Sequence, residues 1–178
     1  MIAAFRIPGA GRLKQAETTR FSFDGQSYAG VEGETLASAL LANGVHLVGR
    51  SFKYHRPRGF LSAGAEEPNA LVEIKRDSAR KTPNVRATVQ ELYDGLTAQS
   101  QNRWPSLSFD VSAVGDIASP LLSAGFYYKT FMGPTRRAWM FYEQFIRKAA
   151  GLGRAGTDPD LDRYDISHAF ADVAIIGG

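Results

Sequence analysis

The chain has no cysteine among its 178 residues. Disulfides, thiolate ligands for a metal or cluster, and cysteine nucleophiles are therefore all excluded. No run of about 18 apolar residues is present, so we expect no transmembrane helix and no membrane contact. Residues 1–8 lack an apolar signal-peptide core, and we expect a cytoplasmic protein. The hydrophobic content of 44% and the charged content of 22% are typical of a globular domain.

The positive charge is concentrated in the first half of the chain. Residues 1–90 contain 13 Lys and Arg against 8 Asp and Glu, a net charge of +5, whereas residues 91–178 have a net charge of −2. The basic half contains the most unusual stretch, GRSFKYHRPRG at residues 49–59. No strand or helix pattern fits this stretch, and Pro57 excludes a helix interior. We expect a specific loop whose cations contact anionic groups.

Four cations of this loop are the candidate anion or interface contacts: Arg50, Lys53, Arg56 and Arg58. They could pair with acidic groups of an adjoining domain or subunit, which is the favoured interpretation. They could also bind a flavin phosphate or a pyrophosphate, or form a solvated surface. We interpret His55 as a hydrogen-bonding residue, because nearby cations disfavour its protonated form. No residue is predicted to be catalytic or to bind a metal.

The first half of the chain has the pattern of strands around one helix. The expected elements are a hairpin at residues 21–23 and 28–31, a helix at 36–43, and strands at 70–75 and 85–92. Thr35 and Gly44 are typical N-cap and C′ residues of the helix. A hairpin followed by a crossing helix begins a β-grasp fold, so we predict an α+β domain with a β-grasp fold over residues 21–97. Residues 1–20 form an arm whose order needs a partner surface.

Residues 98–152 are predicted to form a helical, aromatic-rich connector. One helix is expected around residues 111–122 and another over 135–150. The second helix gathers four large side chains on one face: Trp139, Tyr142, Phe145 and Ile146. These side chains either pack in the core of this chain or cover a partner domain.

The end of the chain resembles the start of a dinucleotide-binding unit. After a flexible linker at residues 153–170, ADVAIIGG at 171–178 predicts a buried parallel strand, the first strand of a Rossmann-type domain. Gly177 and Gly178 would begin the glycine motif that cradles a pyrophosphate, and they are the cofactor-binding candidates. Because the motif stops at its second residue, we expect a fragment of a longer protein.

Several long blocks carry a resemblance to a known family. They are GRSFKYHRPRG at residues 49–59, EEPNALV at 66–72, ELYDGL at 91–96, SQNRWPSL at 100–107 and SAGFYYKTFM at 123–132. With these blocks the chain resembles the N-terminal region of the alpha subunits of heterotetrameric sarcosine oxidases. The resemblance implies a domain similar to 2Fe–2S ferredoxins, followed in the complete subunit by an NAD-binding domain and a folate domain.

The resemblance also implies an activity for the complete complex of alpha, beta, gamma and delta subunits. That complex demethylates sarcosine to glycine, passes electrons through FAD and FMN to oxygen, and transfers a one-carbon unit to tetrahydrofolate. Iron–sulfur relatives bind their cluster through cysteine thiolates in the loop after the helix, here residues 59–65. Without cysteine, this chain is expected to bind no cofactor by itself. We expect it to be a non-catalytic part that docks onto the rest of the alpha subunit and the other subunits.

An alternative of another class is a stand-alone basic module. It would bind an anionic ligand such as single-stranded nucleic acid through Arg50 to Arg58, with Phe52 and Tyr54 as stacking platforms. The favoured hypothesis predicts no nucleic-acid partner.

Overall fold

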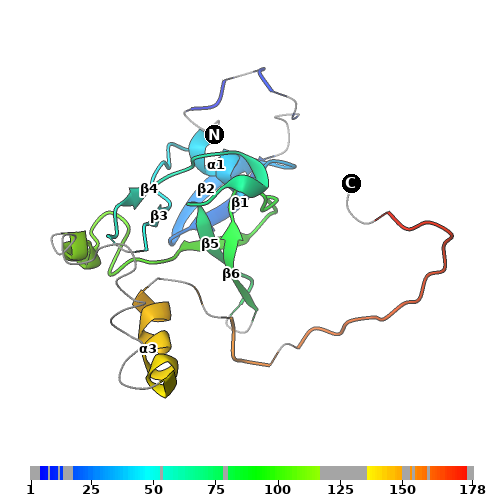
Figure 1. The fold of residues 1–178 in the computed structure, drawn as a ribbon. Helices are drawn as coiled ribbons and strands as arrows, with labels where there is room; N and C mark the ends of the chain where they lie inside the picture. The colour runs from blue at the N-terminus through cyan, green and yellow to red at the C-terminus, as the bar shows by residue number, and fades with distance from the viewer. Residues whose placement is uncertain are drawn as a thin grey trace.

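The computed structural model describes residues 5–7, 9–11, 13, 18–52, 54–77, 80–116, 136–149, 153, 155–159 and 161–175. A five-stranded sheet with the order β2-β1-β7-β5-β6 forms its centre (Figure 1). The strands are β1 (Thr18–Phe23), β2 (Gln26–Val31), β5 (Leu71–Lys75), β6 (Lys81–Arg86) and β7 (Leu96–Ser100). β1 and β7 are parallel, and the other neighbours are antiparallel. The predicted α+β class is confirmed, and the topology is compatible with a β-grasp fold.

The hairpin and helix form where local sequence signals predict them. Asp24 and Gly25 have φ angles of 49° and 82°, the left-handed values that a tight hairpin turn requires. Helix α1 (Leu36–Ala42) begins after Thr35, whose hydroxyl accepts a hydrogen bond from the Ser38 amide at 3.2 Å. Gly44 ends the helix with a φ of 79°. These predictions are confirmed.

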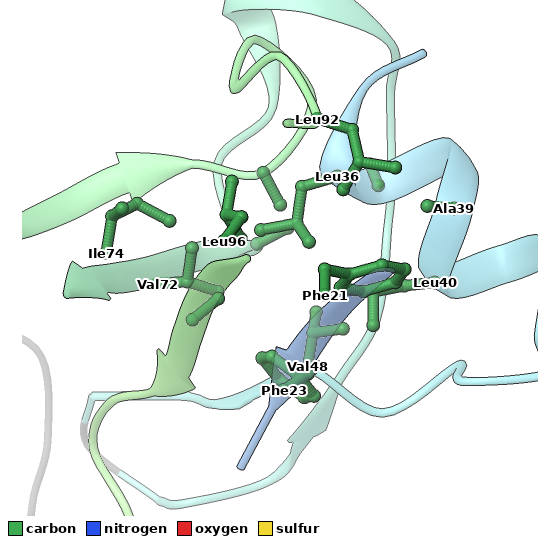
Figure 2. Close-up of a cluster of buried hydrophobic side chains, with 14 of the residues drawn as sticks. Phe21, Phe23, Leu36, Ala39, Leu40, Val48, Val72, Ile74, Leu92 and Leu96 are labelled. Carbon is green, nitrogen blue, oxygen red and sulfur yellow. The ribbon is translucent and has the colours of Figure 1, made fainter. Parts of the chain in front are cut away.

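The core lies between α1 and one face of the sheet. Figure 2 shows Leu36 and Leu40 of α1 facing Phe21 and other sheet side chains. The remaining large members of the core include Phe23, Val48, Val72, Ile74, Leu92 and Leu96. Val48 is fully buried immediately before the basic stretch. The core therefore fixes the point from which that stretch leaves the domain.

One strand prediction is wrong, and one strand of the sheet was not predicted. The strand expected at residues 85–92 ends at Arg86, and a turn follows in which the amides of Val89 and Gln90 donate to the Arg86 carbonyl. Ala87 and Leu92 are buried although they follow the end of the strand, whereas Val89 is 52% exposed. β7 was not predicted, although it lies in the middle of the sheet. The predicted domain end at residue 97 falls inside this strand.

The basic stretch contains a small hairpin, contrary to the expectation that no strand pattern fits it. β3 (Gly49–Arg50) pairs antiparallel with β4 (Pro57–Arg58). The Ser51 amide donates to the Arg56 carbonyl at 3.0 Å, which closes the end of the pair. Residues 49–58 are called the basic hairpin below.

Part of the N-terminal arm packs on its own domain. The Phe5 amide donates to the Ala42 carbonyl at 3.0 Å, and the Phe5 ring contacts His46 edge to face. Arg6 forms hydrogen bonds of 2.7 Å to both carboxylate oxygens of the buried Glu34. The expectation that order in this arm needs a partner surface is therefore wrong for residues 5–7.

The connector is only partly as predicted. A 3₁₀ turn, η2 (Val111–Asp116), stands where the helix at residues 111–122 was expected, and residues 117–122 lie outside the described part. Helix α3 (Arg136–Ala149) confirms the second predicted helix. Met140 and Phe141 are 67% and 63% exposed, and no α3 side chain that the structure describes belongs to the core.

The last described residues do not form the predicted buried strand. Val173 and Ile175 are 77% and 88% exposed, and residues 171–175 have no strand geometry. A buried strand needs neighbours that satisfy its backbone groups, and none of the described strands pairs with this segment. Figure 1 shows the chain after α3 following an extended path. Gly177 and Gly178 lie outside the described residues.

Described residues of the linker at 153–170 contact the sheet domain. The Gly153 amide donates to Asn84 at 3.2 Å, and Arg80 pairs with Asp162 at 2.7 Å. No helix in the described ranges is long and apolar enough to cross a membrane.

Candidate functional site

Arg50 points inward and holds the basic hairpin against the segment after β7. Its Nε donates to the Leu107 carbonyl at 2.9 Å, and its Nη2 contacts the same oxygen. Its Nη1 donates to the His55 carbonyl at 3.1 Å. Arg50 therefore binds backbone carbonyls of its own chain, and its guanidinium has a structural role.

His55 and Asp110 form a second link between these two segments. The Nδ1 atom of His55 lies 2.7 Å from Oδ2 of Asp110. The other carboxylate oxygen of Asp110 accepts hydrogen bonds from the backbone amides of Trp104 and Ser112. Burial raises the pKa of Asp110, but the bonds from His55 and the two amides outweigh it and hold the pKa below its ordinary value. The prediction that His55 is a hydrogen-bonding residue is confirmed.

Arg56 and Arg58 lie on the outside of the basic hairpin. Both are exposed, and the Arg56 guanidinium lies 4.8 Å from the centre of the Tyr54 ring. Arg58 lines a cavity of about 130 Å³ together with Arg50, Asn69, Asn84 and Asn102. Ligand-binding pockets usually measure roughly 300–1,000 Å³, so this cavity is smaller than such pockets. Lys53 lies outside the described residues.

A buried carboxylate lies at the centre of the loop formed by residues 59–70. Oε2 of Glu67 accepts the amides of Leu61 and Ser62, each at 2.7 Å. Oε1 accepts the amides of Asn69 at 2.7 Å and Ala70 at 3.2 Å. Burial raises the pKa of Glu67, but these four backbone bonds outweigh it and lower the pKa. The carboxylate is therefore charged and fully engaged by its own loop.

Two further contacts complete the 59–70 loop. Thr88, in the turn after β6, donates its hydroxyl to the Gly64 carbonyl at 2.6 Å. The Ala87 amide donates to the Ala70 carbonyl at 2.9 Å. The hydroxyl of Ser62 is buried and has no hydrogen-bond partner among the described residues. Within the same residues, no group of three or more His, Cys, Asp and Glu side chains is placed to hold a metal ion.

The sheet domain is similar in sequence to a class of iron–sulfur domains. Residues 16–103 match the model of the 2Fe-2S iron-sulfur cluster binding domain. The chain is also 56% identical to the sarcosine oxidase subunit alpha of Rhizobium meliloti (strain 1021) over 176 residues, 99% of this chain and 18% of that protein. It is 39% identical over 102 residues, 54% of this chain and 10% of the relative, to the same subunit of Corynebacterium sp. (strain U-96). The resemblance to sarcosine oxidase alpha subunits is thereby confirmed, for a chain that spans less than a fifth of the length of these relatives.

A weaker similarity connects the chain to a crystal structure of L-proline dehydrogenase from P. horikoshii. It has a TM-score of 0.39 and 23% identity, and it covers 48% of this chain and 16% of the other. None of these relatives supports the alternative of a stand-alone nucleic-acid-binding module.

The residues of the 59–70 loop do not fit a 2Fe–2S cluster. Plant-type ferredoxins hold the cluster with cysteines spaced C-x₄-C-x₂-C and a fourth cysteine further on. The residues that converge in this loop have the same spacing, Ser62, Glu67 and Ala70, and none of them supplies a thiolate. Glu67 is bound by four amides, and Ala70 has no donor atom in its side chain.

The loop that holds the cluster ligands in iron–sulfur relatives was predicted at residues 59–65, and this range does not include Glu67. The spacing of Ser62, Glu67 and Ala70 was the signal that could have identified it. Asp110 was also missed. Its signal in the sequence is weaker. It is only that an aspartate side chain can accept a hydrogen bond from the backbone amide two residues later, here that of Ser112.

Proposed function

We propose that this chain is the non-catalytic, N-terminal part of a sarcosine oxidase alpha subunit. The observation that carries the proposal is the 56% identity over 99% of the chain. The complete complex would convert sarcosine to glycine, reduce oxygen to hydrogen peroxide through FAD and FMN, and transfer the one-carbon unit to tetrahydrofolate. NAD would bind to the alpha subunit beyond the described residues, at a site that Gly177 and Gly178 begin.

The domain would contribute structure and not electron transfer. Its sequence has no cysteine, and the carboxylate in its 59–70 loop is already bound by backbone amides. A 2Fe–2S centre needs four ligands of suitable chemistry, and this loop supplies none of the usual thiolates. The fold of the iron–sulfur class would thus serve as a scaffold.

The proposed docking surfaces are the outer side of the basic hairpin and the exposed side of α3. Arg56 and Arg58 present positive charge there, and Met140 and Phe141 present apolar surface. Interfaces are rich in Arg and aromatic residues, and exposed apolar patches often mark them. The partners would be the remainder of the alpha subunit and the beta, gamma and delta subunits.

A chimeric enzyme tests the proposal. This chain replaces the matching region of the Rhizobium meliloti alpha subunit, and sarcosine-dependent hydrogen peroxide formation is measured after assembly with the other subunits. We expect the chimera to be active and the isolated chain to form no peroxide from sarcosine. An assembled but inactive chimera, or an isolated chain that oxidises sarcosine, would contradict the proposal.

A further inference from the structure

Glu67 connects the two ends of the 59–70 loop through a single carboxylate. Leu61 and Ser62 donate from the beginning of the loop, and Asn69 and Ala70 donate from its end. Each carboxylate oxygen therefore serves one end. Replacing the carboxylate by an amide would leave an oxygen acceptor for only one end and would set an NH₂ donor against the two amides of the other end.

The 59–70 loop in turn stabilises the buried charge of Glu67. Its side chain is completely buried, and no ion pair to its carboxylate is found among the described residues. Arg86 contacts the residue at another place, where its Nε donates to the Glu67 backbone carbonyl at 3.2 Å. A buried charge is costly unless hydrogen bonds compensate it, and bonds to a charged acceptor are roughly twice as strong as neutral ones. Backbone amides thus supply the compensation here.

We propose that the Glu67 carboxylate is the internal anion that closes and holds the 59–70 loop, at the position where the iron–sulfur class holds its cluster. Ser62, Glu67 and Ala70 have the ligand spacing of that class, and the backbone amides of Ser62 and Ala70 both donate to the Glu67 carboxylate. The loop folds around a side chain of the protein and needs no metal. This inference rests on the described contacts and is independent of the sarcosine oxidase assignment.

The test compares Glu67→Gln with Glu66→Gln in the 178-residue chain. Both variants remove one negative charge from neighbouring positions, but Glu66 is exposed. Hydrogen exchange measured by NMR reports the protection of the Leu61, Ser62, Asn69 and Ala70 amides. In Glu67→Gln we expect protection to fall by about tenfold or more for the pair of amides that faces the new NH₂ group, and in Glu66→Gln we expect all four to stay unchanged. Unchanged protection in Glu67→Gln would overturn the proposal.

If Glu67→Gln does not fold, the wild-type chain provides the test. The carboxyl ¹³C resonance of Glu67 should titrate below the range of an ordinary glutamate, and the protection factors of the four amides, corrected for the intrinsic pH dependence of exchange, should fall in the same pH interval. Titration in the ordinary range with no change in exchange would refute the role of the carboxylate. Uptake of a stoichiometric iron–sulfur cluster by the wild-type chain would refute it as well.

Discussion

The Nδ1 atom of His55 lies 2.7 Å from Oδ2 of Asp110, and this contact joins the basic hairpin to the turn after β7. His55 has a φ angle of 52°, a left-handed conformation that is uncommon outside glycine. The Asp110 carboxylate also accepts the amides of Trp104 and Ser112. Together with the Arg50 contact to Leu107, this pair makes the hairpin and the turn one structural unit.

Asp110→Asn should lower the free energy of unfolding by about 1–3 kcal/mol, because a buried acceptor loses its charge and part of its bonding. The measurement is urea unfolding followed by circular dichroism. Asp165→Asn, at an exposed position, is the matched control and should change stability by less than about 0.5 kcal/mol. Equal stability of both variants would show that Asp110 does not hold this unit together.

Arg50→Lys should also destabilise the chain, by about 1–2 kcal/mol. A lysine ammonium lacks the planar fork that lets Arg50 contact the Leu107 and His55 carbonyls together. Arg58→Lys makes the same change at an exposed position of the same hairpin, and its unfolding midpoint should match that of the wild type. If the two variants unfold alike, the inward orientation of Arg50 contributes nothing to stability.

Acid should destabilise the chain through Glu67 and Asp110. Both carboxyls have folded-state pKa values below their ordinary values, so the folded state binds fewer protons than the unfolded state in this range. Their contribution is fully present above the unfolded pKa values of roughly 4, and it is lost as the pH falls through the lower folded-state values. Urea unfolding between neutral and acidic pH should show this decline, with a shallower slope in Asp110→Asn. An identical slope in that variant would contradict the assignment.

Local chemistry explains the parts of the fold that the sequence predicts. The Asp24–Gly25 turn, the Thr35 cap and Gly44 each act within a few residues, so they can be read directly. No such local signal predicts β7. Its place depends on pairing with β1, which lies about 75 residues earlier, and such pairing has no local signal.

The site was predictable in composition but not in its contacts. The cluster of cations in residues 49–59 correctly drew attention to the hairpin. Its inward partners, Leu107 and Asp110, lie more than fifty residues away in sequence. Glu67 escaped notice because a glutamate is almost always exposed, and only the folded loop brings four amides to it.

The proposed docking of this domain into a sarcosine oxidase complex can be tested at the basic hairpin. Both Arg56 and Arg58 are replaced by Glu in the chimeric alpha subunit. Native mass spectrometry then measures the fraction of that subunit found in the intact complex. The control is Arg76→Glu. Arg76 is exposed, directly follows the last residue of β5 and lies outside the basic hairpin.

We predict that the double charge reversal lowers the assembled fraction by about tenfold or more, while Arg76→Glu assembles like the wild type. The variant domain itself should remain folded, as judged by its circular dichroism spectrum. A charge-reversed subunit that assembles and forms peroxide from sarcosine as the wild type does would contradict the account.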